Sequence, residues 1–323
     1  MNLIKSRAMI VTKISDEAEG IKSLYLEFQD GGKSPNIDPG AHVEIELQDG
    51  LIRSYSLSNA PEHRNLYRIT VARDINSSGG SIFLHDSVRV GDILQVSEQL
   101  NNFKLDTDAE FSLFIAGGIG VTPFVPMIAR LNELNRAWRI VYTARTRNRA
   151  ALLDDLAWLE GQGRGKVELN FNEEPGGTLI DLPTVLGSIP KGSHVYCCGP
   201  EPLLEKFRAV AAEHKIDDEC VHFEYFSGHV DAATAGGFEV VCAKSKLTVQ
   251  VMEGQTILSA LIAAGLDIPF ACSEGICGSC KTSVLEGEPD HRDLILSSKE
   301  RQANDVMYVC CSGSQSKRLV LDL

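Results

Sequence analysis

A group of cysteines near the C-terminal end constrains the fold of this chain more than any other feature of the sequence. Cys272, Cys277 and Cys280 form a C-x4-C-x2-C pattern, and two more cysteines follow further along the chain. This spacing is typical of a plant-type [2Fe–2S] cluster. Gly275 and Gly278 lie inside the pattern, where they allow backbone N–H groups to turn towards the sulfur atoms. The sequence therefore predicts a cluster-binding loop.

The fourth ligand comes from a distant segment, where Cys310 and Cys311 compete for the position. Neighbouring residues of a strand point to opposite faces, so only one of these two side chains would face the loop. The spacing alone leaves this choice open. A zinc site is the alternative for such a set of cysteines, but zinc modules usually show paired C-x2-C knuckles.

Length and composition predict several domains and no membrane span. The chain has 323 residues, and single cores rarely grow beyond about 250. Its 43% hydrophobic and 23% charged residues are ordinary for a globular protein. No apolar run approaches the roughly 18 residues of a membrane span, and the N-terminus shows no signal-peptide pattern. We therefore expect a cytoplasmic protein.

Charge and the remaining cysteines narrow the class of protein further. Lys and Arg number 31 against 44 Asp and Glu, which gives a formal net charge of -13 and argues against nucleic acid as a partner. Nine cysteines in a cytoplasmic chain indicate metal or redox chemistry rather than disulfides. Four of them, at positions 197, 198, 220 and 242, lie in apolar stretches, where we expect small buried hydrophobes.

The hydrophobic patterning predicts a multidomain chain. Short alternating strands, such as 41–47 and 67–73, and a helix at 80–88 suggest an antiparallel β-barrel in residues 1–105. Apolar runs alternate with helical patterns in residues 106–227, as in a doubly wound α/β sheet. Its expected strands are 111–116, 139–144, 167–171 and 194–198, and its expected helices are 124–135, 150–160 and 201–214. Residues 228–237 read as a linker, and residues 238–323 carry a hairpin, a helix and the cysteine loop.

Two segments of the predicted barrel have the chemistry of a flavin site. Arg53, Tyr55 and Ser56 on one strand supply a cation, a flat hydrophobic partner and a hydroxyl group. Further along, Gly79-Gly80-Ser81 opens a helical segment, and such a turn presents N–H groups and a hydroxyl to a phosphate. Each piece alone also suits an ordinary strand or turn, and a four-residue match is weak evidence.

Two glycine turns in the α/β part follow predicted strands. The first holds Gly117, Gly118, Gly120, Thr122 and Pro123, the last two as the expected N-cap and first residue of a helix. The glycines do not follow G-x-G-x-x-G, and a plain tight turn is the alternative.

The second turn is Cys198-Gly199-Pro200. Turns at adjacent strand ends would flank a nicotinamide ring. Cys198 either contacts that ring or is a buried cysteine at a strand end.

With these motifs in place, the chain resembles the phthalate dioxygenase reductase family, which includes the vanillate demethylase and carnitine monooxygenase reductases. The likeness covers essentially the whole chain. It implies an FMN-binding β-barrel domain (1–105), an NAD-binding α/β domain (106–227), a linker (228–237) and a β-grasp [2Fe–2S] ferredoxin domain (238–323).

The resemblance also implies roles for individual residues. Arg53, Tyr55 and Ser56 match the flavin motif, and Ala72, Arg73, Gly79, Gly80 and Ser81 match the second flavin segment, in which the serine meets the FMN phosphate. The two glycine turns match the nicotinamide loops, while Glu224 and Phe226 resemble a segment beside the flavin. Among the ligand candidates, the family favours Cys310. The chain departs from the family at Ser312-Gly-Ser314 and from plant ferredoxins at Ser273, and neither change removes a ligand.

The function implied is an NADH-dependent reductase that moves electrons through FMN and a [2Fe–2S] cluster to a Rieske-type terminal oxygenase, with no general acid or base assigned and no membrane partner. Arg145, Arg147 and Arg149 follow the second strand of the α/β domain, where arginines would accommodate a 2′-phosphate; the family uses NADH. The alternatives are a reductase for a cytochrome or a diiron oxygenase, and a flavin or iron–sulfur redox sensor.

Overall fold

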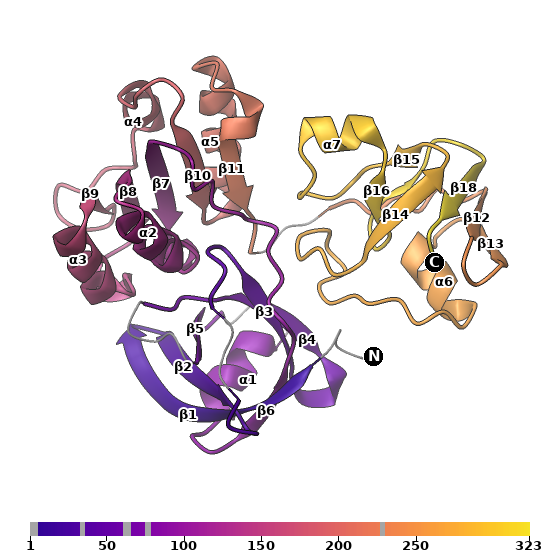
Figure 1. Cartoon of the computed structure of the whole chain (residues 1–323), viewed down its shortest axis with the longest axis horizontal. Helices are drawn as coiled ribbons and strands as arrows, with labels where there is room; N and C mark the ends of the chain where they lie inside the picture. Colours follow the sequence, from indigo (N-terminus) through magenta and orange to yellow (C-terminus); the bar gives the residue numbers. More distant parts are fainter. Residues whose placement is uncertain (1–5, 33–35, 61–65, 75–78, 227–229) are drawn as a thin grey trace. The chain divides into compact units, whose positions relative to one another are not determined.

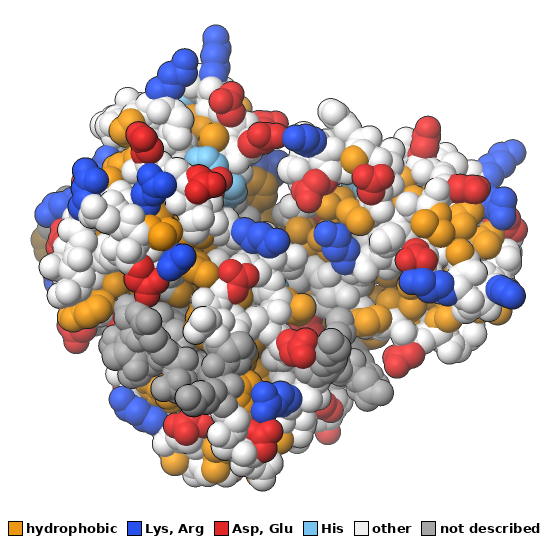
Figure 2. All heavy atoms as spheres, in the orientation of Figure 1, with side chains coloured by type: hydrophobic (Ala, Val, Ile, Leu, Met, Phe, Trp, Pro, Cys, Tyr) orange, Lys and Arg blue, Asp and Glu red, His pale blue; other side chains and the backbone are white. Residues whose placement is uncertain are grey.

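The computed structural model describes residues 6–32, 36–60, 66–74, 79–226 and 230–323 (Figure 1). The chain forms two compact units, a first unit of Lys5–Phe226 and a second unit that begins at Ser227. Among the described residues, no helix combines the length and the apolar character needed to cross a membrane. On the face shown in Figure 2, acidic and basic side chains are interspersed, with small apolar areas between them.

The first unit contains two folds. The N-terminal one is a six-stranded antiparallel sheet closed into a barrel. Its order is β4-β3-β6-β1-β2-β5, and a bridge between Leu57 and Ile69 brings the chain after β4 against β5. The strands are β1 (Arg7–Ala18), β2 (Ile21–Phe28), β3 (His42–Glu46), β4 (Ile52–Ser56), β5 (Tyr67–Ala72) and β6 (Ile93–Val96), with η1 (Gln48–Gly50) and helix α1 (Gly80–Asp86) between them.

The alternation predicted for residues 41–47 is only partly kept. Val43 and Ile45 are fully buried as expected, but the polar members His42 and Glu44 are also buried, at 4% and 2% exposure. The backbone here bonds to a side chain inside the barrel, because Ser97 Oγ accepts from the Glu44 N–H at 2.9 Å. The sequence pattern therefore marks the strand but not the burial of its second face.

The second fold is a five-stranded parallel sheet of order β11-β10-β7-β8-β9, and α2 packs on α3 and α4 on α5. The strands are β7 (Phe111–Gly117), β8 (Ala137–Ala144), β9 (Arg164–Phe171), β10 (His194–Cys198) and β11 (Val221–Glu224). The helices are α2 (Phe124–Glu133), α3 (Leu153–Gln162), α4 (Leu182–Gly187) and α5 (Glu201–Glu213), with short 3-10 turns η3 (Gly118–Val121), η4 (Arg147–Arg149) and η5 (Asp218–Cys220).

The start of α2 differs from the prediction. Thr122 has helical dihedral angles (φ -57°, ψ -47°) and its hydroxyl donates to Ile119 O at 3.1 Å, so it does not cap α2. The N-cap is Pro123, and Pro126 lies within the first turn of the helix. The 3-10 turn at Gly118–Val121 replaces a regular N-terminus, because it carries the chain directly from β7 into the helix.

The two folds of the first unit share one apolar core. Ile21, Ala60 and Phe103 belong to the same buried cluster as Phe124 and Met127 of α2. Burial of this shared surface stabilises the two folds against each other, which makes the first unit a single compact body.

The second unit is a five-stranded mixed sheet of order β13-β12-β18-β14-β16. Its strands are β12 (Phe238–Cys242), β13 (Leu247–Val251), β14 (Lys281–Glu286), β16 (Val306–Tyr308) and β18 (Arg318–Leu321), with β15 (Pro289–Asp290) pairing β17 (Gly313–Ser314). Helix α6 (Ile257–Ala263) is capped by Thr256, and α7 (Ser298–Ala303) begins with a capping box of Ser297 and Glu300. Figure 1 shows α6 and the sheet of this unit together.

The scattered cysteines and the predicted linker lie partly where the sequence predicted them. Of the four scattered cysteines, three are fully buried, but Cys220 is partly exposed because it lies in the turn η5 rather than in a strand. The predicted linker starts in residues 228 and 229, which lie outside the described residues, and residues 230–237 form no helix or strand.

Candidate functional site

The two predicted flavin segments meet at Gly80. Gly80 is buried at the start of α1, and a Cβ atom placed there would lie 2.8 Å from Arg53 Cγ and 3.1 Å from the Tyr55 hydroxyl oxygen. The two side chains of β4 therefore occupy the space that any other residue at position 80 would need. The structure brings Arg53, Tyr55 and Gly80 into one cradle on the barrel.

The phenol of Tyr55 stays neutral within this cradle. Burial raises its pKa well above the ordinary value of 10, and the charge of Arg53 opposes that shift only in part. A neutral phenol both donates and accepts a hydrogen bond. The Tyr55 ring with its hydroxyl therefore suits a flat aromatic ligand with a polar edge.

The second predicted flavin segment is held by local contacts. Arg73, directly after Ala72 at the end of β5, pairs with Asp86 at 2.8 Å on the surface. The Ser81 hydroxyl accepts from the Asp74 N–H at 3.1 Å, and Gly79 has a positive φ of 101°. Residues 75–78 lie outside the described residues.

The two predicted nicotinamide turns pack directly on each other. They follow β7 and β10, which are neighbouring parallel strands, so both lie at the carboxyl edge of the sheet, where ligands of open α/β folds bind. A Cβ at Gly120 would lie 2.2 Å from Cys198 O, and one at Gly117 would lie 2.7 Å from Pro200 Cδ. Glycine at these positions is required by close approach of the two turns.

A contact joins β4, the predicted flavin strand, to this edge of the sheet. The Ser56 hydroxyl donates to Glu224 Oε2 at 3.4 Å, and Glu224 pairs in register with Cys198. Burial raises the pKa of Glu224 from 4.5 to about 8, while the Ser56 hydrogen bond acts in the opposite direction. Cys198 has no exposed surface, whereas Phe226 is 38% exposed.

The cysteine loop of the second unit brings the predicted ligands together in two pairs. Cys272 and Cys277 are joined by a side-chain hydrogen bond, and so are Cys280 and Cys310. In each pair the second thiol accepts, which lowers the pKa of Cys277 and of Cys310. Thiolates are the form that binds iron.

The loop geometry agrees with the glycine positions in the sequence. Gly275 and Gly278 have positive φ angles of 70° and 86°, a conformation that glycine adopts without strain. The Gly275 N–H donates to the Cys310 sulfur, and its carbonyl accepts from Leu294 N–H at 3.0 Å. The loop is thus anchored on the segment after β15, a contact that no sequence signal marks.

The prediction that Cys310 and Cys311 lie in a strand was wrong. β16 ends at Tyr308, and both cysteines lie in the turn that follows, in which the Cys311 and Ser312 N–H groups donate to Tyr308 O. Cys311 Sγ lies near Gly275, 2.7 Å from the position of a Cβ there, and 3.8 Å from Tyr308 O. Strand alternation therefore says nothing about this pair, and contact with Cys280 distinguishes Cys310.

The thiols suit a two-iron group. No three His, Cys, Asp or Glu side chains in the described ranges are placed to hold one metal ion; the four predicted cysteines instead form two buried or nearly buried pairs. Two thiolates for each of two irons is the ligand set of a [2Fe–2S] cluster. The Ser279 hydroxyl, 3.3 Å from Cys277 Sγ, is a further neighbour that the sequence analysis did not name, although it lies inside the motif.

Comparisons with known proteins show which proteins the chain resembles. Residues 240–314 match the 2Fe-2S iron-sulfur cluster binding domain. The chain is 47% identical over 286 residues to phenoxybenzoate dioxygenase subunit beta of Ectopseudomonas oleovorans, covering 88% of each chain.

Two solved structures are similar along nearly the whole chain. The structure of phthalate dioxygenase reductase has 32% identity and a TM-score of 0.69, with 98% of each chain covered. An intact type IV self-sufficient cytochrome P450 monooxygenase has 37% identity and a TM-score of 0.89, over 98% of this chain and 41% of the P450.

The chain belongs to the phthalate dioxygenase reductase family. It is a flavin and iron–sulfur oxidoreductase, with FMN and a [2Fe–2S] cluster as cofactors and NADH as electron donor. Its fold is the predicted one: a flavin barrel, a nucleotide-binding parallel sheet and a ferredoxin domain.

Proposed function

We propose that this chain is the reductase component of a Rieske-type oxygenase system and that it supplies the electrons for oxygen activation by a separate terminal oxygenase. The observation that carries the proposal is the contact of Ser56 with Glu224, which joins the flavin strand to the nucleotide edge of the sheet inside one compact unit. The second unit of the same chain holds the paired cysteines.

The cluster ligands that we propose are Cys272, Cys277, Cys280 and Cys310. Their pairwise contacts support this assignment, and the contact of Cys310 with Cys280 supports Cys310 over Cys311. The Gly275 N–H also donates to the Cys310 sulfur. Hydrogen bonds of this kind orient a ligand and tune the potential of a cluster.

We propose the barrel cradle as the FMN site and the two glycine turns as the NADH site. Arg53, Tyr55 and Ser56 would hold the flavin ring and Ser81 its phosphate, while Gly117, Gly120 and Gly199 would let the nucleotide approach the backbone. When bound, FMN accepts a hydride from NADH and gives electrons singly to the cluster. Glu224, neutral below about pH 8, leaves no negative charge beside the flavin site.

The direction of electron flow follows from typical potentials. Plant-type clusters lie near about -400 mV and Rieske centres between about -150 and +300 mV, so the last transfer runs downhill. We further propose a cytoplasmic location, and domain limits at residues 1–105, 106–227 and 238–323 around a linker.

A reconstituted electron-transfer assay tests the proposal. The purified holoprotein, NADH and a purified Rieske-type oxygenase component are mixed without oxygen, and reduction of the Rieske centre is followed by its EPR signal. We expect complete reduction at a rate that depends on the holoprotein. A Rieske centre that stays oxidised while NADH is consumed with ferricyanide would contradict the proposed acceptor.

A haem acceptor is the second candidate, because the similar P450 carries a corresponding reductase region within one chain. In the same assay, a purified cytochrome P450 would replace the Rieske component. Faster reduction of the haem than of the Rieske centre would favour this candidate.

A further inference from the structure

A nearly buried ion pair joins the two folds of the first unit. Arg68 lies on β5 of the barrel and Asp155 on α3, and Arg68 Nη1 is 3.2 Å from both Oδ1 and Oδ2 of Asp155. Their side chains are 3% and 11% exposed. The guanidinium is thus removed from water on a barrel strand and neutralised by a residue of the nucleotide-binding fold.

The same guanidinium holds the end of the flavin strand. Arg68 Nε donates to Ser58 O at 2.8 Å, and Arg68 Nη2 donates to the same carbonyl. Ser58 lies two residues after Ser56, and its hydroxyl contacts Thr70 Oγ1 at 2.7 Å. Arg68 therefore connects Asp155 of α3 to the backbone that carries the flavin motif.

Hydrogen bonds add a defined direction to the apolar packing between the two folds. The shared core around Ile21, Phe103 and Phe124 gains free energy from burial, which has no preferred direction. An arginine fork with two fixed sets of hydrogen bonds does have a direction. Breaking such a buried pair is costly, because a charge remains without its partner.

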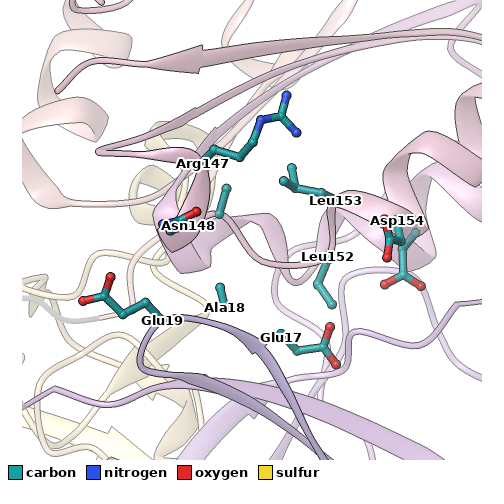
Figure 3. A pocket seen from close by; sticks show the side chains of 10 residues that line it. Glu17, Ala18, Glu19, Arg147, Asn148, Leu152, Leu153 and Asp154 are labelled. Carbon is teal, nitrogen blue, oxygen red and sulfur yellow. The ribbon is translucent and has the colours of Figure 1, made fainter. Parts of the chain in front are cut away.

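A second ion pair at this boundary is exposed to water. A pocket of about 530 Å³ lies between the β1–β2 hairpin and the start of α3, and Figure 3 shows Glu17 and Glu19 on the hairpin across from Arg147 and Leu153. Beside it, Arg149 pairs with Glu19 at 3.1 Å, with side chains 47% and 62% exposed. Exposed pairs of this kind contribute little and are screened by salt, so they cannot replace the buried pair.

We propose that Arg68 and Asp155 are positioning residues for hydride transfer, which hold the nucleotide edge of the sheet at a fixed distance and angle from the flavin strand. Neither residue belongs to the proposed flavin or nicotinamide sites; the pair acts through Ser58 on one side and α3 on the other. The inference rests on the proposed NADH and FMN sites.

The test measures flavin reduction by NADH in an anaerobic stopped-flow experiment with the full-length holoprotein. Asp155→Asn keeps the shape of the side chain and removes its charge. We expect the limiting rate constant to fall by about 10- to 100-fold, the range that small misplacements of reacting groups produce, with full FMN content and an NADH Kd within about threefold of the wild type. A matched control is Glu168→Gln, which breaks the 2.7 Å pair of Arg139 and Glu168 inside the nucleotide-binding fold and should change the rate less than twofold.

Arg68→Lys tests the same pair from the barrel side, because lysine keeps the positive charge but lacks the guanidinium fork. It replaces Asp155→Asn if that variant does not fold. We expect a similar fall in the limiting rate. In the double variant the two losses should not add, as for residues that act as one unit.

Limiting rates within twofold of the wild type for a folded, FMN-loaded variant would overturn the inference, and so would strictly additive losses. A lower melting temperature with an unchanged rate would show a structural role only and would also overturn it. A wild-type holoprotein whose flavin is not reduced by NADH would instead contradict the proposed function.

Discussion

Ser56 of the barrel and Glu224 of the parallel sheet are in contact, with the serine hydroxyl 3.4 Å from the carboxyl oxygen. The two residues are far apart in sequence and belong to different folds, yet they meet where β4, the proposed flavin strand, faces the proposed nucleotide edge of the sheet. Burial raises the pKa of Glu224 from 4.5 to about 8, so this carboxyl is neutral at pH 7.

That raised pKa predicts how stability depends on pH. Between about pH 4.5 and 8 the folded chain holds a proton on Glu224 that the unfolded chain has lost, so the free energy of unfolding falls as pH rises through this window and levels off above it. The free energy of unfolding changes by at most about 1.4 kcal/mol per pH unit, which corresponds to one proton. Urea unfolding of the wild type and of Glu224→Gln from pH 5 to 9 measures the difference, which should show this slope. The exposed variant Glu213→Gln is the control, and an equal pH dependence in all three proteins would refute the assignment.

The contacts of the cysteines predict which of two neighbours binds the cluster. Cys310→Ser should abolish the visible and EPR signals of the [2Fe–2S] cluster, because Cys310 pairs with Cys280. Cys311→Ser should retain both signals, since its sulfur contacts Cys310, Tyr308 O and Ser312 Oγ, whereas Cys280 pairs with Cys310. The two variants are matched in chemistry and position. A cluster retained in Cys310→Ser and lost in Cys311→Ser would reverse the proposal.

The cradle around Gly80 predicts a loss of flavin on adding one methyl group. In Gly80→Ala the new Cβ would meet Arg53 Cγ at 2.8 Å, and overpacking of this kind costs about 1–3 kcal/mol. We expect FMN to dissociate at least about tenfold more readily, measured by fluorescence of the released flavin. Gly161→Ala is the control, because it lies in α3 with no atom within 4 Å of its Cβ and should be neutral or stabilising. Equal FMN affinity in both variants would argue against the cradle.

The arginines after β8 predict the choice of nucleotide. Arg145 pairs with Glu173 at 3.6 Å and Arg149 with Glu19 at 3.1 Å, so two of the three cations already have acidic partners that would repel a 2′-phosphate. We expect NADH to be preferred. Glu173→Gln should raise kcat/KM for NADPH by about 1.5- to 5-fold, the range of an exposed ion pair, while kcat/KM for NADH stays constant. Comparable wild-type kcat/KM values for the two nucleotides would overturn this view.

The sequence predicted the strands and helices that have a strong hydrophobic period. It did not predict short elements that depend on local caps or tertiary contacts. The apolar runs of β7 and β10 and the long helix α5 were predicted within a few residues of their observed ends. The short helices α4 and α7 were not predicted, because each spans only 6 residues and depends on a cap, Asp181 or Ser297.

In the candidate site, too, local patterns were predictable from the sequence and non-local contacts were not. The spacing of Cys272, Cys277 and Cys280 predicts a cluster loop because all three lie within nine residues of sequence. The turn that holds Cys310 depends on hydrogen bonds to Tyr308 O, which no local pattern encodes. The pairing of Arg68 with Asp155 joins residues 87 positions apart, and only folding of both parts brings them together.

The division of the chain into two units predicts that its second unit is an outlet for electrons rather than a structural cap. The first unit, Lys5–Phe226, contains the proposed flavin cradle, both glycine turns and its own apolar cores, so a chain that ends at Gly236 should fold and bind FMN. It should oxidise NADH with ferricyanide at about the full-length rate, since this small acceptor takes electrons from the flavin. With cytochrome c or a Rieske-type oxygenase it should lose most of its activity. Full-length Cys310→Ser is the control and should behave like the truncated chain if loss of the cluster alone explains the defect. A truncated chain that reduces the oxygenase as fast as the full-length protein would contradict a linear path from NADH through FMN and the cluster.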